Sequence, residues 1–316
     1  MRHLKLIPDD TKFPFVRWRH VALGLSLVVM LGSIALLFTR GLNFGIDFEG
    51  GIVIEIATDG PADMAKLRSD LGGLGLGDVQ IQAFGQPDDV LIRVQSPKDD
   101  TEDASQQVVN KIRSVLGDTV EYRRVEVVGP QVSSELVEDG ILAVVVSVFL
   151  MLIYIWFRFE WQFSLGSVVA LVHDVLATLG LFSILHLEFS LQSIAALLTI
   201  VGYSMNDTVI VFDRVRENLR KYKKMDLGEL IDLSINQTLS RTVMTSGTTL
   251  LALFSLFIFG GEVIRDFTFA MIFGIFIGTY SSIFIAAPVL LAIGVTRDAT
   301  TGGLGRGAKD KVPGKA

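Results

Sequence analysis

The chain contains no cysteine, and only four histidines occur among its 316 residues. The absence of cysteine excludes a disulfide-stapled scaffold, a thiolate metal site and a cysteine nucleophile. The histidines, His3, His20, His173 and His186, show none of the short spacings that bring two imidazoles onto one metal ion. We therefore expect no metal ion and no cofactor.

What the chain has in excess is apolar sequence. Hydrophobic residues make up 50% of it, and the mean hydropathy is +0.50. Several apolar runs exceed the roughly 18 residues that mark a membrane-spanning helix. The runs predict six spans, at residues 21–38, 141–157, 163–185, 191–212, 242–259 and 267–293. The expected fold class is therefore an α-helical polytopic membrane protein with six transmembrane helices.

The first run resembles a signal peptide only superficially. It is too long for the apolar core of one, and residues 39–42 offer no small-x-small cleavage site. We therefore expect an uncleaved first helix.

Positive charges set the expected orientation. Lys and Arg gather in residues 1–20, in the connection at 213–241 and in the tail at 297–316. The connections at 186–190 and 260–266 together hold a single basic residue, Arg265. The positive-inside rule then places both termini and a 213–241 loop in the cytoplasm. The glycine-rich tail is expected to be disordered.

One extramembrane domain is expected at residues 39–139, between the first two spans, which places it on the extracytoplasmic side of the membrane. Apolar alternation predicts four strands, at 51–58, 79–84, 90–95 and 119–128. Two helices are predicted between these strands, one that begins at Pro61 as its first residue and one that is capped at its N-terminus by Thr101. The resulting β-α-β-β-α-β order indicates an α+β, ferredoxin-like domain.

This domain is strongly acidic. Residues 41–139 hold 19 Asp and Glu against 8 Lys and Arg, a net charge of −11, while the rest of the chain carries +5. Such a balance is typical of a solvated surface that keeps a small domain soluble, and it favours this interpretation over a patch for basic segments. It also argues against nucleic acid as a partner.

Asn206 and Asp207 interrupt the apolar run at 191–212. An ionised Asp at the centre of a membrane helix costs at least about 2.5–3.5 kcal/mol, so such a residue usually faces a protein interior or a pathway. One interpretation is a structural hydrogen bond between helices. The other is a carboxyl group that binds and releases protons, because low-dielectric surroundings disfavour its charged form.

Arg241 is predicted to lie at the same depth as Asp207. Asp207 is about 24 Å from the outer end of its helix at Leu191, and Arg241 is about 27 Å from the outer end of the next helix at Phe259. A switchable ion pair between the two is one interpretation. A snorkelling residue that belongs to the cytoplasmic positive charge is the other.

Further polar residues have two interpretations each. Thr208 and Thr245, together with Asn206, either polarise the pair or serve packing. His173 and Asp174, midway along the third span, either extend a proton relay or are structural, since His titrates near neutral pH.

Three other patterns concern helix ends and contacts. Asp213, Arg214, Arg216 and Glu217 indicate a solvated helix end. Residues 227–239 are amphipathic and predict an interfacial helix. The sixth span repeats a small residue every fourth position, which predicts a close contact with another helix of this chain or of a partner. This stripe comprises Ala270, Gly274, Gly278, Ser282 and Ala286.

Glycines mark the passage from the first span into the domain. Gly45, Gly50 and Gly51 allow positive φ, which suits a hinge that includes Asp47 and equally suits a rigid turn.

Four motifs, in order around six spans, carry a family resemblance: FGIDFEGG (44–51), GPQVSSEL (129–136), VGYSMNDTVIVFDRVREN (201–218) and SINQTLSRTVMTSGTTL (234–250). With them the chain resembles the SecF family of the bacterial Sec protein-export machinery, over nearly its whole length up to Arg297.

The resemblance implies an accessory, non-enzymatic role in protein export at the bacterial inner membrane, with the extramembrane domain in the periplasm. Its implied partners are SecD, the SecYEG channel with SecA, YajC, preproteins and membrane lipid. It also implies use of the proton-motive force, with Asp207 as the proton-coupling carboxylate and Arg241 as its basic partner.

Two other functions are compatible with parts of the pattern. A small-molecule exporter of the related resistance-nodulation-division type would share the membrane carboxylate, but it would carry two large periplasmic insertions where this chain has one small one. A purely structural scaffold would need neither an intramembrane Asp nor an Arg at its depth. Six spans with one insertion instead resemble one half of a twelve-span transporter built from two repeats.

Overall fold

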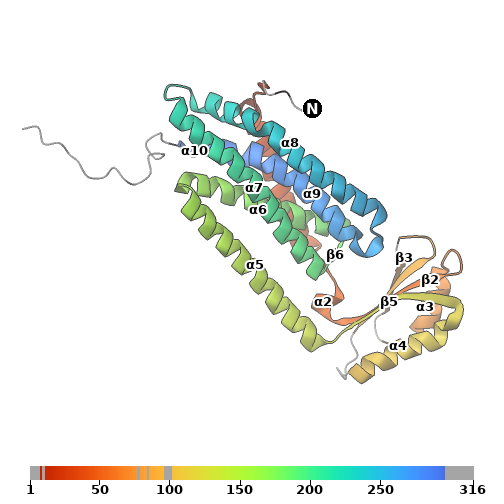
Figure 1. Cartoon of the computed structure of the whole chain (residues 1–316). Coiled ribbons are helices and arrows are strands. Elements are labelled where there is room, and N and C mark those ends of the chain that lie inside the picture. The colour runs from red at the N-terminus through yellow and green to blue at the C-terminus, as the bar shows by residue number, and fades with distance from the viewer. Residues whose placement is uncertain (1–7, 9–10, 77–78, 84, 96–101, 296–316) are drawn as a thin grey trace, which may run out of the picture.

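The computed structural model describes residue 8 and residues 11–76, 79–83, 85–95 and 102–295. It has two parts, a bundle of long helices and a smaller unit built on a β-sheet, and the sheet unit lies at one end of the bundle (Figure 1). The predicted Thr101 cap, the first seven residues and the 297–316 tail lie outside the described residues.

Within the described residues, six helices are long and apolar enough to cross a membrane. They are Val16–Thr39 (a 3-10 turn, Val16–Trp18, and α1, Arg19–Thr39), α5 (Pro130–Arg158), α6 (Trp161–Leu185), α7 (Leu191–Lys221), α8 (Leu227–Phe259) and Arg265–Ile293. The last consists of α9 (Arg265–Ser281), a π-helical turn (Ser282–Ala286) and α10 (Ala287–Ile293). Each predicted span lies inside one of these helices, which confirms six apolar helices.

Local chemistry explains where these helices begin and change. Pro130 occupies the first turn of α5, where its missing N–H costs nothing. Ser190 and Ser193 form a capping box at the start of α7. The π-helical turn lies just before Pro288, whose ring cannot fit against the preceding turn of a regular α-helix. Sequence alone indicated none of this irregularity in the sixth span.

The 213–241 segment differs from the predicted loop, because nearly all of it is helical. α7 continues to Lys221, α8 begins at Leu227 with Asp226 as its N-cap, and only residues 222–226 connect them. The two helices form a hairpin in Figure 1, at the end of the bundle away from the sheet.

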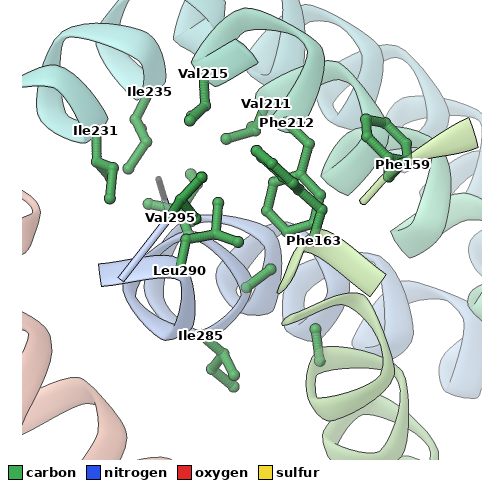
Figure 2. Packing of buried hydrophobic residues seen from close by; sticks show 14 of the residues in the cluster. Phe159, Phe163, Val211, Phe212, Val215, Ile231, Ile235, Ile285, Leu290 and Val295 are labelled. Carbon is green, nitrogen blue, oxygen red and sulfur yellow. The ribbon is translucent and has the colours of Figure 1, made fainter. Parts of the chain in front are cut away.

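Apolar packing explains why this segment is not a loop. Val211, Val215 and Leu219 on α7 are buried in one cluster with Ile231 and Ile235 on α8 (Figure 2). No proline interrupts α8, so the amphipathic stretch 227–239 is its first third, and the prediction of a separate interfacial helix was wrong.

The charged residues at 213–217 are also less free than predicted. Asp213 accepts two hydrogen bonds from Arg158 at 2.6 and 2.7 Å, and Arg216 lies over the ring of Phe159 at 5.4 Å. These contacts fasten the C-terminal end of α5 to α7.

The sheet unit has the element order β-α-β-β-α-β. Its members are β2 (Gly51–Thr58), α3 (Met64–Gly72), β3 (Val79–Ala83), β4 (Asp89–Val94), α4 (Glu102–Leu116) and β5 (Val120–Val128). The strands are antiparallel in the order β3-β4-β2-β5, with α3 and α4 against one face. Ile52, Ile54 and Ile56 of β2 fill the core beneath these helices. Helix α3 begins after Asp63, which caps it, and not at Pro61 as predicted.

The small-residue stripe of the sixth span packs against α7 of the same chain. A Cβ added to Gly274 would lie 2.3 Å from Ile200, and one added to Gly278 would lie 2.9 Å from the Cβ of Ser204. Both distances are too short for real atoms, so these glycines are what allows the two helices to approach. The sequence left the neighbour of this stripe open, and the structure identifies it as α7.

Candidate functional site

Asp207 lies inside the bundle, on α7, with 4% of its surface exposed. Its carboxylate accepts a hydrogen bond from each of two neighbouring elements. Thr242 Oγ1 on α8 donates to Oδ1 at 2.6 Å, and Ser282 Oγ in the π-helical turn donates to Oδ2 at 2.5 Å. Both oxygens of the acid are therefore held by hydroxyl groups in a site without bulk water.

Arg241 is exposed and lies next to Thr242 on α8. In the described part of the chain no ion pair joins it to Asp207, so the direct pair suggested by the matching depths is not formed. Its positive charge nevertheless attracts the carboxylate through space. Asp207 is thus contacted directly by two hydroxyl groups, while the compensating charge of Arg241 lies nearby without touching it.

A second buried acid, Asp174, lies on α6 beside His173. His173 Nδ1 is 3.0 Å from Asp174 Oδ1. The other oxygen, Oδ2, accepts hydrogen bonds from Ser204 on α7 at 2.5 Å and from Ser281 on α9 at 2.7 Å. The sequence identified this polar pair, and the structure adds the two serines that bind it.

The other residues singled out from the sequence surround Asp207 without touching its carboxylate. Asn206 is exposed and lines a groove of about 490 Å³ between α5 and α7, together with Ser147 and Tyr154. Thr208 is buried, but Asp207 does not accept from it. Thr245 donates to the backbone carbonyls of Arg241 and Thr242.

Sequence reasoning missed the hydroxyl groups that complete both sites. Ser204 lies three residues before Asp207, on the same face of α7, and this spacing was the available signal. Ser282 was assigned to helix packing because it belongs to the small-residue stripe. Thr242 carried no signal beyond its place next to Arg241.

The sequence of this chain matches two family models of known proteins. Residues 107–296 match the family model described as "Protein export membrane protein SecD/SecF, C-terminal", and residues 35–62 match "SecD/SecF GG Motif". The chain is 48% identical over 309 residues to the protein translocase subunit SecF of Rhodobacter capsulatus, covering 93% of both chains. It is 46% identical over 296 residues to SecF of Vibrio alginolyticus, covering 93% of this chain and 94% of that one.

The chain belongs to the SecF family. Its fold agrees with this membership. The crystal structure of SecDF from Thermus thermophilus, a translocon-associated membrane protein, superposes with a TM-score of 0.81 and is 37% identical. That similarity covers 91% of this SecF-family chain but 39% of the SecDF chain, so this chain spans about two fifths of it. A structure of SecDF in a super-membrane-facing form gives a TM-score of 0.68 at 35% identity.

The GG motif of this SecF-family chain lies where the sheet unit meets the bundle. Gly50 and Gly51 have φ of 71° and 127°, as predicted for glycines that need positive φ, whereas Gly45 does not. A Cβ on Gly50 would come within 3.4 Å of Ser133 and of the carbonyl oxygen of Val128. The motif is therefore packed against the start of α5.

The same motif is also bound to the start of α7. Strand β1 (Asn43–Phe44) pairs in parallel with β6 (Glu188–Phe189), and the Gly45 N–H donates to Phe189 O at 2.9 Å. In the short helix α2 (Ile46–Glu49), Asp47 accepts a hydrogen bond from the backbone N–H of Leu191, the first residue of α7, at 2.9 Å. A carboxylate at this position also meets the positive end of the helix dipole.

One ion pair links the sheet itself to the same connection. Arg93 of β4 pairs with Glu188 of β6. In addition, the hydrogen bond with Glu126 raises the pKa of the Arg124 side chain, and the negative charges of Glu126 and Glu188 add to this effect. A polar cleft of about 310 Å³ lies between these groups and Asp266.

Proposed function

We propose that this chain is an accessory subunit of the Sec protein translocase that, together with SecD, uses the proton-motive force to promote late steps of preprotein export. The observation that carries the proposal is Asp207, an ionisable group buried in an apolar bundle of a SecF-family chain. The role is transport rather than catalysis.

In this proposal Asp207 binds and releases the proton. The ionised form is stabilised by the hydroxyls of Thr242 and Ser282 and by the positive charge of Arg241. The protonated form needs no charge compensation and suits the low dielectric of the bundle. Two states of similar energy are what a coupling site requires, because only then does a gradient shift their populations.

We also propose the orientation in the membrane. The basic connection between α7 and α8 and both termini face the cytoplasm, and the sheet unit is a periplasmic, ferredoxin-like domain. Its support is the distribution of Lys and Arg, together with the position of the sheet unit at the opposite end of the bundle from the α7–α8 turn (Figure 1).

Reporter fusions test this orientation. A reporter that is active only in the periplasm is expected to be active when inserted at Gly60 and inactive when inserted at Lys223. A reporter that is active at Lys223 would contradict the six-span arrangement. Western blotting of each fusion controls for its expression.

SecD is the proposed direct partner, within an assembly that includes SecYEG, SecA and YajC. The support is the length of SecDF, of which this chain matches about two fifths, and the surface of the bundle. Asn206 is a polar side chain exposed in an otherwise largely apolar groove, and polar groups in membrane helices usually bind across a helix interface. A second subunit carrying its own carboxylate would complete the site there.

Reconstitution decides whether the chain works in this way. Vesicles that hold SecYEG and both subunits are expected to complete export faster when a proton gradient is imposed. Vesicles that hold this chain without SecD are expected to show no such acceleration, because half of the proposed interface is absent. Acceleration by this chain alone would contradict the shared site.

A further inference from the structure

The two buried acids are connected by consecutive residues. Ser281 is the last residue of α9 and donates to Asp174, whereas Ser282 is the first residue of the π-helical turn and donates to Asp207. Both serines and Asp174 are completely buried. The peptide bond between Ser281 and Ser282 therefore links the donor to Asp174 of α6 with the donor to Asp207 of α7.

Each serine has a second acceptor within reach. Ser281 Oγ lies 3.1 Å from the carbonyl oxygen of Gly278, and Ser282 Oγ lies 3.0 Å from that of Thr279. A carboxylate accepts through both oxygens, but a protonated carboxyl group carries one O–H donor. Protonation of Asp207 at Oδ2 would therefore reverse its hydrogen bond with Ser282. Asp207 would donate to the Ser282 hydroxyl, and this hydroxyl would donate to Thr279 O instead.

The backbone around the two serines is suited to transmit such a change. Serine hydroxyls that bond to the preceding turn bend helices, and a π-helical turn starts at this point of the sixth span. The absence of a Cβ on Gly278 brings the backbone of α9 against Ser204, which is the other donor to Asp174. A displacement of α9 that lengthens the hydrogen bond between Ser281 and Asp174 thus also changes the hydrogen bond between Ser282 and Asp207.

The groups that face the two acids are few. Asp174 faces His173 of its own helix, Ser204 of α7 and Ser281 of α9. The ring of Tyr280 lies 6.0 Å from that of His173, and its hydroxyl donates to Ala22 O of α1. Asp207 faces Thr242 and Ser282 and is attracted by the charge of Arg241. Among the described residues that contact the two acids or act on them, the ionisable groups are thus His173, with Tyr280 beside it, and Arg241.

We infer that Asp174 is a positioning residue for Asp207, linked to it through the Ser281–Ser282 pair, so that the hydrogen bonds of one acid change with the protonation of the other. The inference rests on the proposed function in that it takes Asp207 as the proton-binding group. It assigns to α6 and α9 a part in coupling that the resemblance places on Asp207 and Arg241.

Carbodiimide labelling of Asp207 tests the link directly. Dicyclohexylcarbodiimide reacts with protonated carboxyl groups in apolar surroundings, and mass spectrometry of the full-length chain in membrane vesicles measures the labelling of Asp207 at each pH. We expect Asp174→Asn and Ser281→Ala each to change the labelling rate near neutral pH by about threefold or more, as for directly interacting titrating sites. Ser281→Thr, which keeps the hydroxyl, is expected to stay close to wild type.

The controls separate a link from general loosening of the fold. Ser183→Ala removes another buried serine of α6, one that donates to Leu36 O, and should leave the profile of Asp207 unchanged. The double variant Asp174→Asn/Ser281→Ala should change labelling no more than the single variants do, because both remove one connection.

The inference is overturned if the labelling profiles of Asp174→Asn and Ser281→Ala superimpose on that of wild type, or if the two effects simply add. The measurement needs neither SecD nor a preprotein. An unchanged export activity in a variant of Asp207 would therefore defeat the proposed function without deciding this inference.

Discussion

Replacing Asp207 by Asn is expected to abolish the proton-driven part of export while leaving the bundle folded. An amide has nearly the same size, and it still offers one acceptor oxygen, but it cannot take up a proton. The hydroxyl that loses its acceptor has a substitute, since Ser282 already lies 3.0 Å from Thr279 O. We expect the free energy of unfolding to fall by only about 1 kcal/mol.

The measurement is completion of preprotein export in vesicles that contain SecYEG, SecD and the variant, with and without a proton gradient. The rate with the gradient should fall to the rate without it. Asp213→Asn is the matched control, because Asp213 is on the same helix but exposed and paired with Arg158. An exposed ion pair contributes about 1 kcal/mol or less, so the control should respond to the gradient like wild type. An undiminished response in Asp207→Asn would make Asp207 a structural residue.

Replacing Arg241 by Met is expected to have an effect of similar size. Arg241 is exposed and holds no ion pair with Asp207 in the described part of the chain, so its loss should leave folding and assembly with SecD intact. The ionised carboxylate, however, loses a positive charge in surroundings that screen charges poorly. Proton release should then fail, and the sheet unit should be trapped in one arrangement relative to SecD.

Three variants distinguish charge from structure at this position. Arg241→Lys keeps the positive charge and should retain part of the gradient response. Arg214→Met removes an arginine that pairs with Glu217 on the surface and should behave like wild type. Cross-linking between the sheet unit and SecD reports whether Arg241→Met is trapped in one arrangement. If Arg241→Met exports as well as wild type beside SecD, the compensating role is wrong.

The sequence was most informative where a residue contradicts its surroundings. Asp207 and Asp174 could be found because carboxyl groups are rare in apolar runs, and the spans could be found from the runs themselves. The hydroxyl groups that donate to these acids could not. Thr242 and Ser282 are residues that membrane helices also use for packing, and only the crossing of α7, α8 and the π-helical turn brings their hydroxyls to one carboxylate.

The 213–241 segment was predicted only in part. Its dense charges indicated a solvated helix end at 213–217 and a cytoplasmic connection, and residues 227–239 predicted an interfacial helix rather than the start of α8. The apolar residues between those charges recur at helical spacing and pack across the α7–α8 hairpin, as Val215 does in the same cluster as Ile231. Long-range packing decided the structure, and a window of local sequence contains no information about which face will find a partner.

The contact between Asp47 and Leu191 has a mechanical consequence. With 31 residues, α7 is a rod of about 46 Å, and Asp207 lies about halfway along it. Because the hydrogen bonds of a helix run parallel to its axis, a shift along α7 is carried to its N-terminal end with little stretching. At that end Asp47 accepts a hydrogen bond from the backbone N–H of Leu191, and only Phe48, Glu49 and Gly50 separate Asp47 from the first residue of strand β2. The connection from α7 to the sheet is thus short and anchored, so a shift of α7 would reach strand β2 without a wide hinge motion.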